Sequence, residues 1–437
     1  MRIGMAATAN GTTGILIDDR GKIHEERVEQ RGAELSEMVS DILRRLKRRA
    51  ASPGTNPIPQ AITIDVSDAL TPNRSASFIV VRIAPRPPVD AGHELSDSAE
   101  NRYRTRIVHV SGGHTILGDE LVPLDTAALI RIARSAGRAP NYVISGVGSL
   151  VNPSHEQTAG RILLEHSEPA SIEFSHRFSS SAIAVRERTA VLNSALTPGA
   201  AALGTSLVLA VEAAAPLSRL YVTTNDGGST TIAQLSEAPI HALHAGRSTE
   251  LIGAAALCGI DDGALIVDDG TAPFFGEIID GVPTVVPTHR ASGPAVSTQA
   301  ANVRGVTDIE LHGGADRPLL VTHGADGPSP LGLSAHSHAD HSLRALGAAC
   351  APLSEWANRV VDVSNATEME QALANARARV EARLVSLGAV PASIRIPESR
   401  VIATAYQHPR VVTVRVRGIA GESTGSILTG GAARAPR

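Results

Sequence analysis

This chain of 437 residues is short of aromatic residues, cysteine and net charge, and each shortage excludes a class of function. Aromatic residues make up 2% of the sequence, which is too few for the stacking platforms that bind single-stranded nucleic acid. The formal net charge of −4 gives no basic footprint for nucleic acid or for an anionic membrane. The two cysteines, Cys258 and Cys350, form neither a disulfide framework nor, alone, a zinc site.

Long apolar runs are also missing from the sequence. The first residues, MRIGMAATANG, lack the apolar segment of a secretory signal. The longest apolar stretch, residues 200–215, is interrupted by Glu212 and is too short to span a bilayer. We therefore expect a cytoplasmic protein that binds neither nucleic acid nor membrane, with cores built from alanine, valine, isoleucine and leucine.

The elements expected in the first half predict an α/β fold. Short strands over residues 2–6, 14–17 and 22–28 precede a helix whose apolar residues recur at helical spacing over residues 35–46. A strand over residues 61–66 follows. This order of strand, hairpin, helix and strand is that of the ribonuclease H-like half of actin-like proteins. The first half continues with strands over residues 108–110 and 141–145 and helices over residues 125–136, 153–165 and 182–196.

The second half repeats this alternation less clearly. We expect strands over residues 219–223, 264–267 and 276–286, with helices over residues 230–236 and 248–258 between them. In the C-terminal part, a capping box of Thr367 and Glu370 opens a helix that Gly388 ends. Three further strands are expected over residues 392–397, 401–406 and 411–416.

Three separated blocks of sequence point to a known family. The first covers residues 144–156, with Asn152-Pro153 followed by His155-Glu156, and the second covers residues 175–196, where Ser175-His176 precedes RERTAVLNSAL. The third covers residues 220–281 and places two glycine turns around a helix of small residues. In this order and spacing, the blocks resemble the A-type subunit of the ATP-dependent hydantoinase/oxoprolinase family over roughly residues 1–345.

The resemblance implies both a fold and a reaction. The fold would be actin-like, with two ribonuclease H-like lobes over residues 1–197 and 198–345, an α/β appendage over 346–425 and a flexible tail over 426–437. The reaction would be ATP-dependent hydrolysis of a cyclic amide such as a hydantoin or 5-oxoproline, with Mg²⁺ and possible association with a B-type subunit. Related members carboxylate ketones, so the resemblance leaves the reaction type open.

Three turns are the candidate nucleotide site implied by the resemblance. Phosphates are bound by closely approaching backbone N–H groups and by hydroxyls, which explains glycine and threonine at such turns. The same residue types also form ordinary hairpin turns and strand-to-helix connections. The candidate nucleotide-binding residues are Asn10, Gly11, Thr12 and Thr13 in the first turn, Asn225, Gly227 and Gly228 in the second, and Gly270 and Thr271 in the third.

The resemblance also implies roles for acidic residues and a histidine. Asp268 or Asp269 would bind the metal, and Asp226 or His312 would handle the proton. The sequence departs from the family where an acid should follow the first strand, because Ala7-Thr8 stands there. Asp65-Val66-Ser67-Asp68 stands near a place where the family has a histidine-glycine-threonine stretch. These departures favour an alternative, a non-catalytic actin-like module that acts with a partner subunit.

A separate motif, His336-Ser337-His338-Ala339-Asp340-His341, matches the two-metal signature of metallo-β-lactamase-like hydrolases. That site needs two further histidines downstream, and only His408 follows. A helix start with Ser337 and Asp340 as a capping box competes with the metal site. A metal-dependent hydrolase that uses this motif is kept as the second alternative, after the actin-like module.

Overall fold

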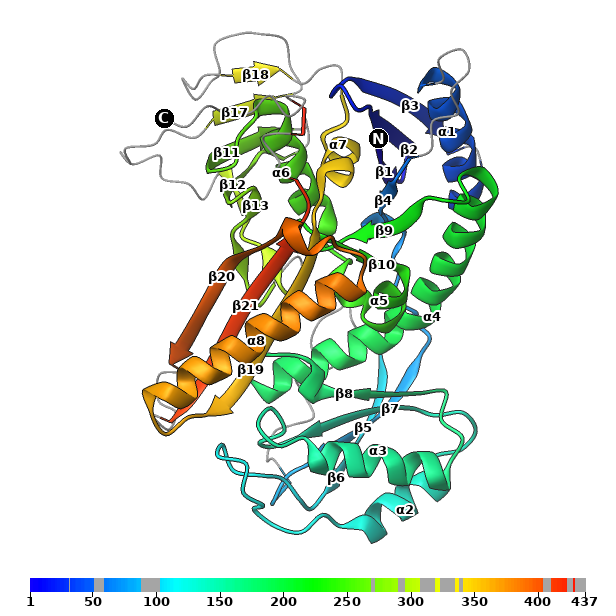
Figure 1. Ribbon diagram of the computed structural model, residues 1–437. Coiled ribbons are helices and arrows are strands. Elements are labelled where there is room, and N and C mark those ends of the chain that lie inside the picture. Colours follow the sequence, from blue (N-terminus) through cyan, green and yellow to red (C-terminus); the bar gives the residue numbers. More distant parts are fainter. Residues whose placement is uncertain are drawn as a thin grey trace.

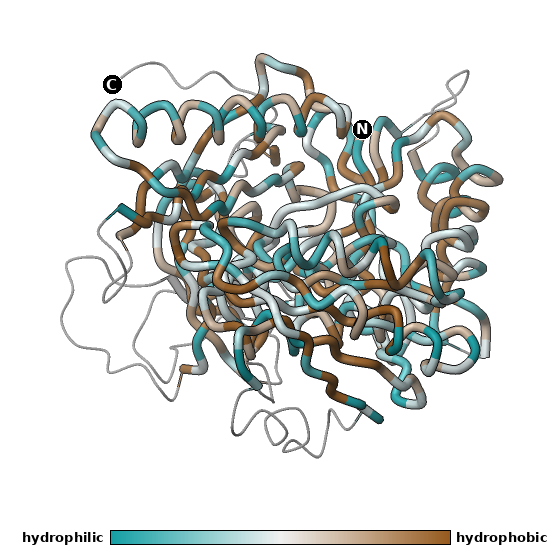
Figure 2. The backbone as a smooth tube through the Cα atoms, turned by 90° about the horizontal axis from the view of Figure 1, so that it is seen from below, coloured by the Kyte–Doolittle hydropathy of each residue, from teal (hydrophilic) through white to brown (hydrophobic). Residues whose placement is uncertain are grey.

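The computed structural model describes most of the chain (Figure 1). Within that part, the strands form sheets of nine, six, four and two strands. Figure 2, a view from below, shows apolar stretches gathered toward the middle of the molecule. The described residues are 1–30, 32–50, 59–87, 103–268, 272–289, 295–306, 319–322, 335–337, 341–403, 410–422 and 427–428.

The nine-stranded sheet has the order β20-β21-β19-β10-β9-β4-β1-β2-β3. Its N-terminal strands confirm the expected hairpins: β1, β2 and β3 are antiparallel, and β4 and β9 run parallel to β1. Helix α1 (Leu35–Ala50) buries Val39, Ile42 and Leu46 against this sheet, as the helical spacing predicted. The bounds are β1 (Arg2–Thr8), β2 (Gly11–Ile17), β3 (Ile23–Glu29), β4 (Ala61–Asp65) and β9 (Arg219–Thr223).

A second sheet repeats this topology with the order β13-β12-β11-β17-β18. Strands β11, β12 and β13 are antiparallel, and β17 and β18 run parallel to β11. Strand β16 (Arg304–Gly305) adds to β12, and β14 (Val285–Val286) pairs separately with β15 (Ala300–Ala301). The bounds are β11 (Gly263–Asp268), β12 (Phe274–Ile279), β13 (Val282–Pro283), β17 (Leu319–Thr322) and β18 (Ala335–Ser337).

Helices α6 (Ala245–Cys258) and α7 (Leu343–Cys350) join the two sheets. They cross where Gly253 meets the carbonyl of Leu343 and Gly347 meets the carbonyl of Thr249, and a Cβ at either glycine would overlap that carbonyl. Helix α7 also lies directly on β1, because a Cβ at Gly4 would overlap the backbone of α7. Glycine at these three positions therefore permits backbones to approach more closely than any side chain allows.

A four-stranded parallel sheet, unexpected as a separate unit, lies below the nine-stranded sheet in Figure 1. Its order is β6-β5-β7-β8, and it has its own apolar core with α2 (Thr126–Ser135) and α3 (Ser154–His166). Strands β5 and β8 were not predicted, although SFIVVRI in β5 is a typical buried parallel strand. The bounds are β5 (Ser77–Ile83), β6 (Arg104–Val110), β7 (Asn141–Gly146) and β8 (Ser171–Phe174).

Helix α4 (Ile183–Ala214) connects the four-stranded sheet to the nine-stranded sheet. We expected it to end at residue 196, but it continues past Pro198 to Ala214 and has 32 residues in all. One carbonyl in the turn before the proline accepts a hydrogen bond from outside the helix, since Asn73 N donates to Ala195 O at 2.9 Å. By length and composition alone α4 could cross a membrane, yet Leu196 and Leu207 lie buried in the main core.

The C-terminal segment extends the nine-stranded sheet. Strand β10 (Ser229–Thr231) pairs with β19 (Leu353–Asp362), and β19, β21 and β20 continue as antiparallel strands under helix α8. Short helical pieces, including α5 (Ile232–Glu237), follow β10. The expected domain boundaries after residues 197 and 345 fall inside α4 and α7. The remaining bounds are α8 (Ala366–Ser386), β20 (Ile394–Ala403) and β21 (Val411–Ala420).

The capping box expected at Thr367 and Glu370 was wrong by two residues. The N-cap is Asn365, whose Oδ1 accepts from Glu368 N at 2.9 Å, while Glu368 Oε2 accepts from Ser364 N at 2.7 Å. Asparagine caps as well as threonine does, and both candidate caps have an acid three residues later, so the pattern alone did not decide between the two registers. Gly388, with φ of 101°, follows the helix end as predicted.

The helix crossing predicts unequal effects of two similar substitutions. Gly347→Ala forces α6 and α7 apart, and we expect it to lower the free energy of unfolding by about 3 kcal/mol or more. Gly199→Ala lies inside α4, where the nearest atom to an added Cβ is 3.7 Å away. This control should leave stability unchanged or raise it by about 1 kcal/mol. Equal effects in urea denaturation would contradict the close crossing.

Candidate functional site

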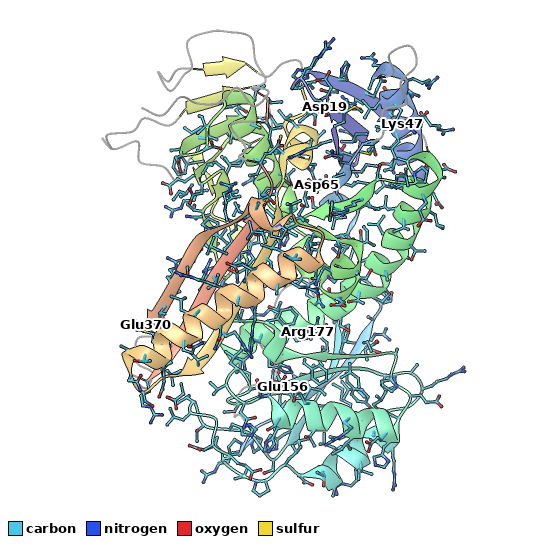
Figure 3. All side chains as sticks on the ribbon, viewed as in Figure 1. Asp19, Lys47, Asp65, Glu156, Arg177 and Glu370 are labelled. Atoms are coloured by element: carbon cyan, nitrogen blue, oxygen red, sulfur yellow. The ribbon has the colours of Figure 1, made fainter. Side chains whose placement is uncertain are left out.

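The carboxyl edge of the nine-stranded sheet brings together two of the predicted turns. Strands β1, β4 and β9 are parallel, so their carboxyl ends lie at one edge, where ligands of α/β sheets commonly bind. The turn containing Asn10 and Gly11 follows β1, and the turn from Asn225 to Gly228 follows β9. Asp65 ends β4 between them and lies beside α7 (Figure 3).

The first turn is a two-residue hairpin in which Thr8 pairs with Gly11. Gly11 has φ of 137°, and a Cβ there would overlap the Val28 carbonyl, so the hairpin itself requires glycine. Thr12 is fully buried, with its Oγ1 3.8 Å from Met38 Sδ, and so it points into the core beneath α1. Thr13 is half-buried within β2, which leaves the exposed Asn10 as the side chain of this turn at the sheet edge.

Asn225 organises the segment that leads into α6. Its Nδ2 donates to Ile240 O at 2.8 Å and lies 3.0 Å from Thr298 Oγ1. Its Oδ1 accepts from His244 N at 2.8 Å, immediately before α6 begins at Ala245. The side chain is 1% exposed. Asn225 therefore fixes where the N-terminus of α6 lies relative to the edge of the sheet.

Asp226 joins β9 to the C-terminal strands. Its carboxylate accepts hydrogen bonds from Ser354 Oγ at 2.6 Å, Trp356 Nε1 at 2.8 Å and Thr224 Oγ1 at 2.5 Å. Arg417 NH2 lies 3.1 Å away, in an ion pair whose side chains are both 3% exposed. Burial alone would raise the pKa of the Asp226 carboxyl, but Arg417 and these hydrogen bonds outweigh it and lower the pKa to about 2.

The two glycines after Asp226 are explained by packing within the protein. A Cβ at Gly227, which has φ of 84°, would lie 2.7 Å from Pro283, and a Cβ at Gly228 would overlap Ser354. The second predicted turn thus lies against neighbouring segments of the chain. The predicted proton-handling role of Asp226 and nucleotide-binding role of the glycines stay predictions, because their present contacts are all internal.

A charged cluster that the sequence did not reveal lies at the same edge. Arg344, near the start of α7, places its Nε 2.8 Å from Asp65 Oδ2, its NH1 2.9 Å from Asp68 Oδ2 and its NH2 2.7 Å from Ser67 Oγ. Burial alone would lower the pKa of Arg344, but the two carboxylates raise it above its usual range. The acid at the end of strand 61–65 was visible in the sequence, whereas nothing local marked its partner 279 residues away.

This cluster lies at the N-terminus of α6. A Cβ at Gly246 in the first turn of α6 would come within 3.1 Å of the Arg344 guanidinium. The N-cap residue of α6, His244, makes no side-chain capping hydrogen bond. A helix N-terminus carries partial positive charge, so a guanidinium beside it needs anionic neighbours. Asp65 and Asp68 supply that negative charge in this structure.

Of the remaining predicted site residues, some are described by the structure and others are not. Asp268 is half-buried at the end of β11, where its position in the second sheet corresponds to that of Thr8 in the first. Asp269, Gly270, Thr271 and His312 lie outside the described residues, as do His338 and Asp340 of the histidine motif. His341 Nδ1 lies 3.2 Å from Glu25 Oε2. Among the described residues, no group of three or more His, Cys, Asp or Glu is arranged to hold a metal ion.

Two of the motif blocks meet at the carboxyl edge of the four-stranded sheet. Glu156 is fully buried and accepts from Gly146 N at 2.7 Å, Ser175 Oγ at 2.8 Å and His176 Nδ1 at 2.6 Å. This network links β7, α3 and the turn after β8 (Figure 3). The blocks therefore build a buried network within the fold, which their sequence spacing alone could not show.

Comparison with known proteins is informative only at the level of structure. No protein-family model and no curated protein matches the sequence. A nucleotide-free acetone carboxylase structure, from work on ATP-dependent acetone carboxylation, matches with a TM-score of 0.68 at 12% identity, covering 97% of this chain and 89% of that one. The ATP-dependent caprolactamase from Pseudomonas jessenii matches with a TM-score of 0.66 at 14% identity, covering 96% and 87%. The chain has the fold of these enzymes.

The buried ion pair of Asp226 predicts a large, pH-dependent contribution to stability. Asp226→Asn leaves Arg417 buried without a counter-charge, and we expect the free energy of unfolding at pH 7 to fall by about 3 kcal/mol. The folded pKa of about 2 lies below the usual aspartate value of 3.8, so the stabilisation is present above pH 3.8 and is lost as the pH falls through 2. The deficit of the variant should thus be equal at pH 7 and 5 and smaller at pH 3.

The surface pair of Asp362 and Arg410 supplies the control for this experiment. Its side chains are 26% and 46% exposed, so Asp362→Asn should cost about 1 kcal/mol or less. Urea denaturation of both variants at the three pH values measures the difference. A similar cost for both variants at pH 7 would contradict the assignment of Asp226 as the link between β9 and the C-terminal strands.

Proposed function

We propose that this protein binds magnesium ATP at the carboxyl edge of the nine-stranded sheet and uses it to activate the carbonyl group of a cyclic amide of the hydantoin or 5-oxoproline type. One observation carries the proposal: Arg344, whose side chain is 13% exposed, lies beside the N-terminus of α6, where the N-cap residue makes no side-chain hydrogen bond. A cation and a helix N-terminus together form a site for a phosphate group. The fold shared with two ATP-dependent enzymes, one acting on a ketone and one on a lactam, supports it.

The residues present fit a nucleotide phosphate at this place. Gly246 leaves no Cβ between the helix backbone and Arg344, and the hairpin at Asn10 and Gly11 lies at the same sheet edge. Asp68, whose side chain is 47% exposed, and Asp268 at the end of β11 are the carboxylates that would hold Mg²⁺. When bound, ATP would supply a phosphoryl group that converts the amide oxygen into a better leaving group.

The chain's own residues would position these groups. Arg344 would bind the phosphate charge, and Asn225 would hold the start of α6 in place through His244. Through Ser354 and Trp356, Asp226 would keep β19 against the turn after β9. A proton-handling role for Asp226 or His312 stays a prediction. The contacts of Asp226 support the other part of this scheme, in which Asp226 joins β9 to β19 and β21.

A second candidate function rests on one specific observation. Asp226 is fully engaged inside the protein, and Asp65 is already paired with Arg344. A site whose charges are satisfied internally suits an actin-like module without catalysis that acts with a partner, for which a B-type hydantoinase-like subunit is the proposed candidate. Binding of ATP separates the two candidates, because the module has no need of the nucleotide.

Calorimetric titration of the chelator-treated protein with ATP tests the proposal. We expect micromolar binding that requires Mg²⁺. The double variant Asp65→Asn, Arg344→Gln keeps hydrogen-bonding side chains and removes both charges of the pair, so that neither is left without the other. It should weaken ATP binding at least about tenfold, which corresponds to about 1.4 kcal/mol. Arg410→Gln, at an exposed ion pair, is the control and should bind as the wild type does. Absence of binding at millimolar ATP would favour the partner-binding module instead.

A further inference from the structure

A cavity of about 450 Å³ lies at the carboxyl edge of the four-stranded sheet, away from the turns discussed above. The order β6-β5-β7-β8 reverses between β5 and β7, and open parallel sheets bind ligands in the crevice at such a reversal. The loop after β7 forms one wall with Val147, Gly148 and Leu150, and Val147 N donates to Ile83 O at the end of β5. The size is that of a small-molecule site.

The opposite wall comes from the C-terminal strands. Asn358 and Val360 on β19, Ile402 on β20 and Thr413 on β21 line the cavity. The far ends of these strands lie at the lower left of Figure 1, and they line the cavity together with the loop after β7. The cavity is therefore formed between two parts of the chain with separate apolar cores, which is a common place for ligand sites.

Apolar side chains that the fold leaves exposed gather around this cavity. Ile116, Ile183 and Ile402 are 46%, 36% and 36% exposed, and all three line it. They come from three distant segments, a loop, the start of α4 and β20. Exposed large apolar residues grouped around a hollow favour a ligand with an apolar body.

One buried cation in this wall has no carboxylate partner. Arg186 on α4 is 3% exposed, and its guanidinium donates to the Ser180, Ser181 and Gly146 carbonyls and to Ser149 Oγ. No ion pair of Arg186 is found among the described residues, and its Nε has no hydrogen-bond partner.

The neighbouring acids are already engaged. Glu187 pairs with Arg82 through two hydrogen bonds of 2.8 and 2.6 Å, and Glu156 accepts from His176. Arg186 therefore feels the charge of both acids but forms a direct ion pair with neither, and a buried charged group at a cavity wall with a donor left over is typical of binding sites. A second buried arginine, Arg415, lines the same cavity, with its Nε 2.8 Å from Glu398 Oε1.

We propose that this cavity binds a small carboxylate with a short apolar chain, with Arg186 as the partner of the carboxylate group. The Nε–H group of Arg186, which has no partner among the described residues, would donate a charge-assisted hydrogen bond to the carboxylate, and the isoleucines would enclose the chain. An inorganic anion would leave the apolar walls in contact with water. A neutral molecule would form no charge-assisted hydrogen bond with Arg186. A carboxylate with an apolar chain would contact both Arg186 and the apolar side chains of the cavity.

This ligand site goes beyond the proposed reaction and does not need ATP. Ser179 and Asn358 also line a neighbouring cavity of about 290 Å³ that reaches Thr224 and Asp226, so the two cavities adjoin. Hydrolysis of a cyclic amide opens the ring to a carboxylate on a short chain. Only this link to the turn after β9 rests on the proposed function.

Calorimetric titration with hexanoate, in the absence of ATP, tests the site. We expect hexanoate to bind, hexanamide and inorganic phosphate to bind at least about tenfold more weakly, and Arg186→Gln to lose at least about tenfold in hexanoate affinity. Because Arg186→Gln can disturb folding, Ile402→Trp fills the cavity without touching the arginine and should cause a similar loss. Ile279→Trp, at a residue 51% exposed on β12, is the matched control and should bind normally.

Two results would overturn the proposal. Equal binding of hexanamide and hexanoate would show that no anion is recognised, and absence of hexanoate binding at about 10 mM would remove the site altogether. Neither result depends on ATP, so failure here leaves the nucleotide proposal untouched. Conversely, hexanoate binding to a protein that does not bind ATP would keep this site and discard the proposed reaction.

Discussion

The close crossing of α6 and α7 is the contact on which the rest of this structure depends. Gly253 and Gly347 let the two helices touch backbone to backbone, and Gly4 lets α7 lie directly on β1. Helix α7 therefore lies on the nine-stranded sheet, α6 contacts both sheets of repeated topology, and the N-terminus of α6 is brought to the carboxyl edge of the nine-stranded sheet. If α7 stood a side chain away from β1, Arg344 could not reach Asp65 on the neighbouring strand β4.

Buried charge pairs then join segments that are far apart in sequence. Asp65 pairs with Arg344, Asp226 with Arg417, and Glu187 with Arg82, and each pair bridges different elements. Such pairs contribute little net stability compared with apolar contacts, but losing one partner is costly, so they fix one arrangement of the elements. Arg186, which forms no ion pair within the part of the chain that the structure describes, stands apart from this pattern.

The sequence predicted what short-range patterns encode. Hydrophobic spacing located β1 to β4, α1 and α8, and the order of these elements led to the fold class. Strand β5 was missed although its run SFIVVRI has the apolar, β-branched composition of a buried strand. Helix α4 was cut short at Pro198 because the donor that satisfies a carbonyl beside it, Asn73, belongs to a distant loop.

The candidate site was predictable only in part. Glycine turns after β1 and β9 were found from composition, but several of their side chains point into the protein: Thr12 packs under α1, and Asp226 pairs with β21. Arg344 was invisible in the sequence, because only the folded chain brings α7 to the end of β4. Pairings between residues hundreds of positions apart leave no periodicity to read.

Hydrogen exchange of backbone amides, followed by mass spectrometry with and without magnesium ATP, tests the central claim most directly. The account predicts slower exchange in the turn at residues 8–11 and in the first turn of α6, residues 245–248, when the nucleotide is present. Unchanged exchange at both places under saturating ATP, or protection confined to other segments, would contradict a nucleotide site at this edge of the sheet.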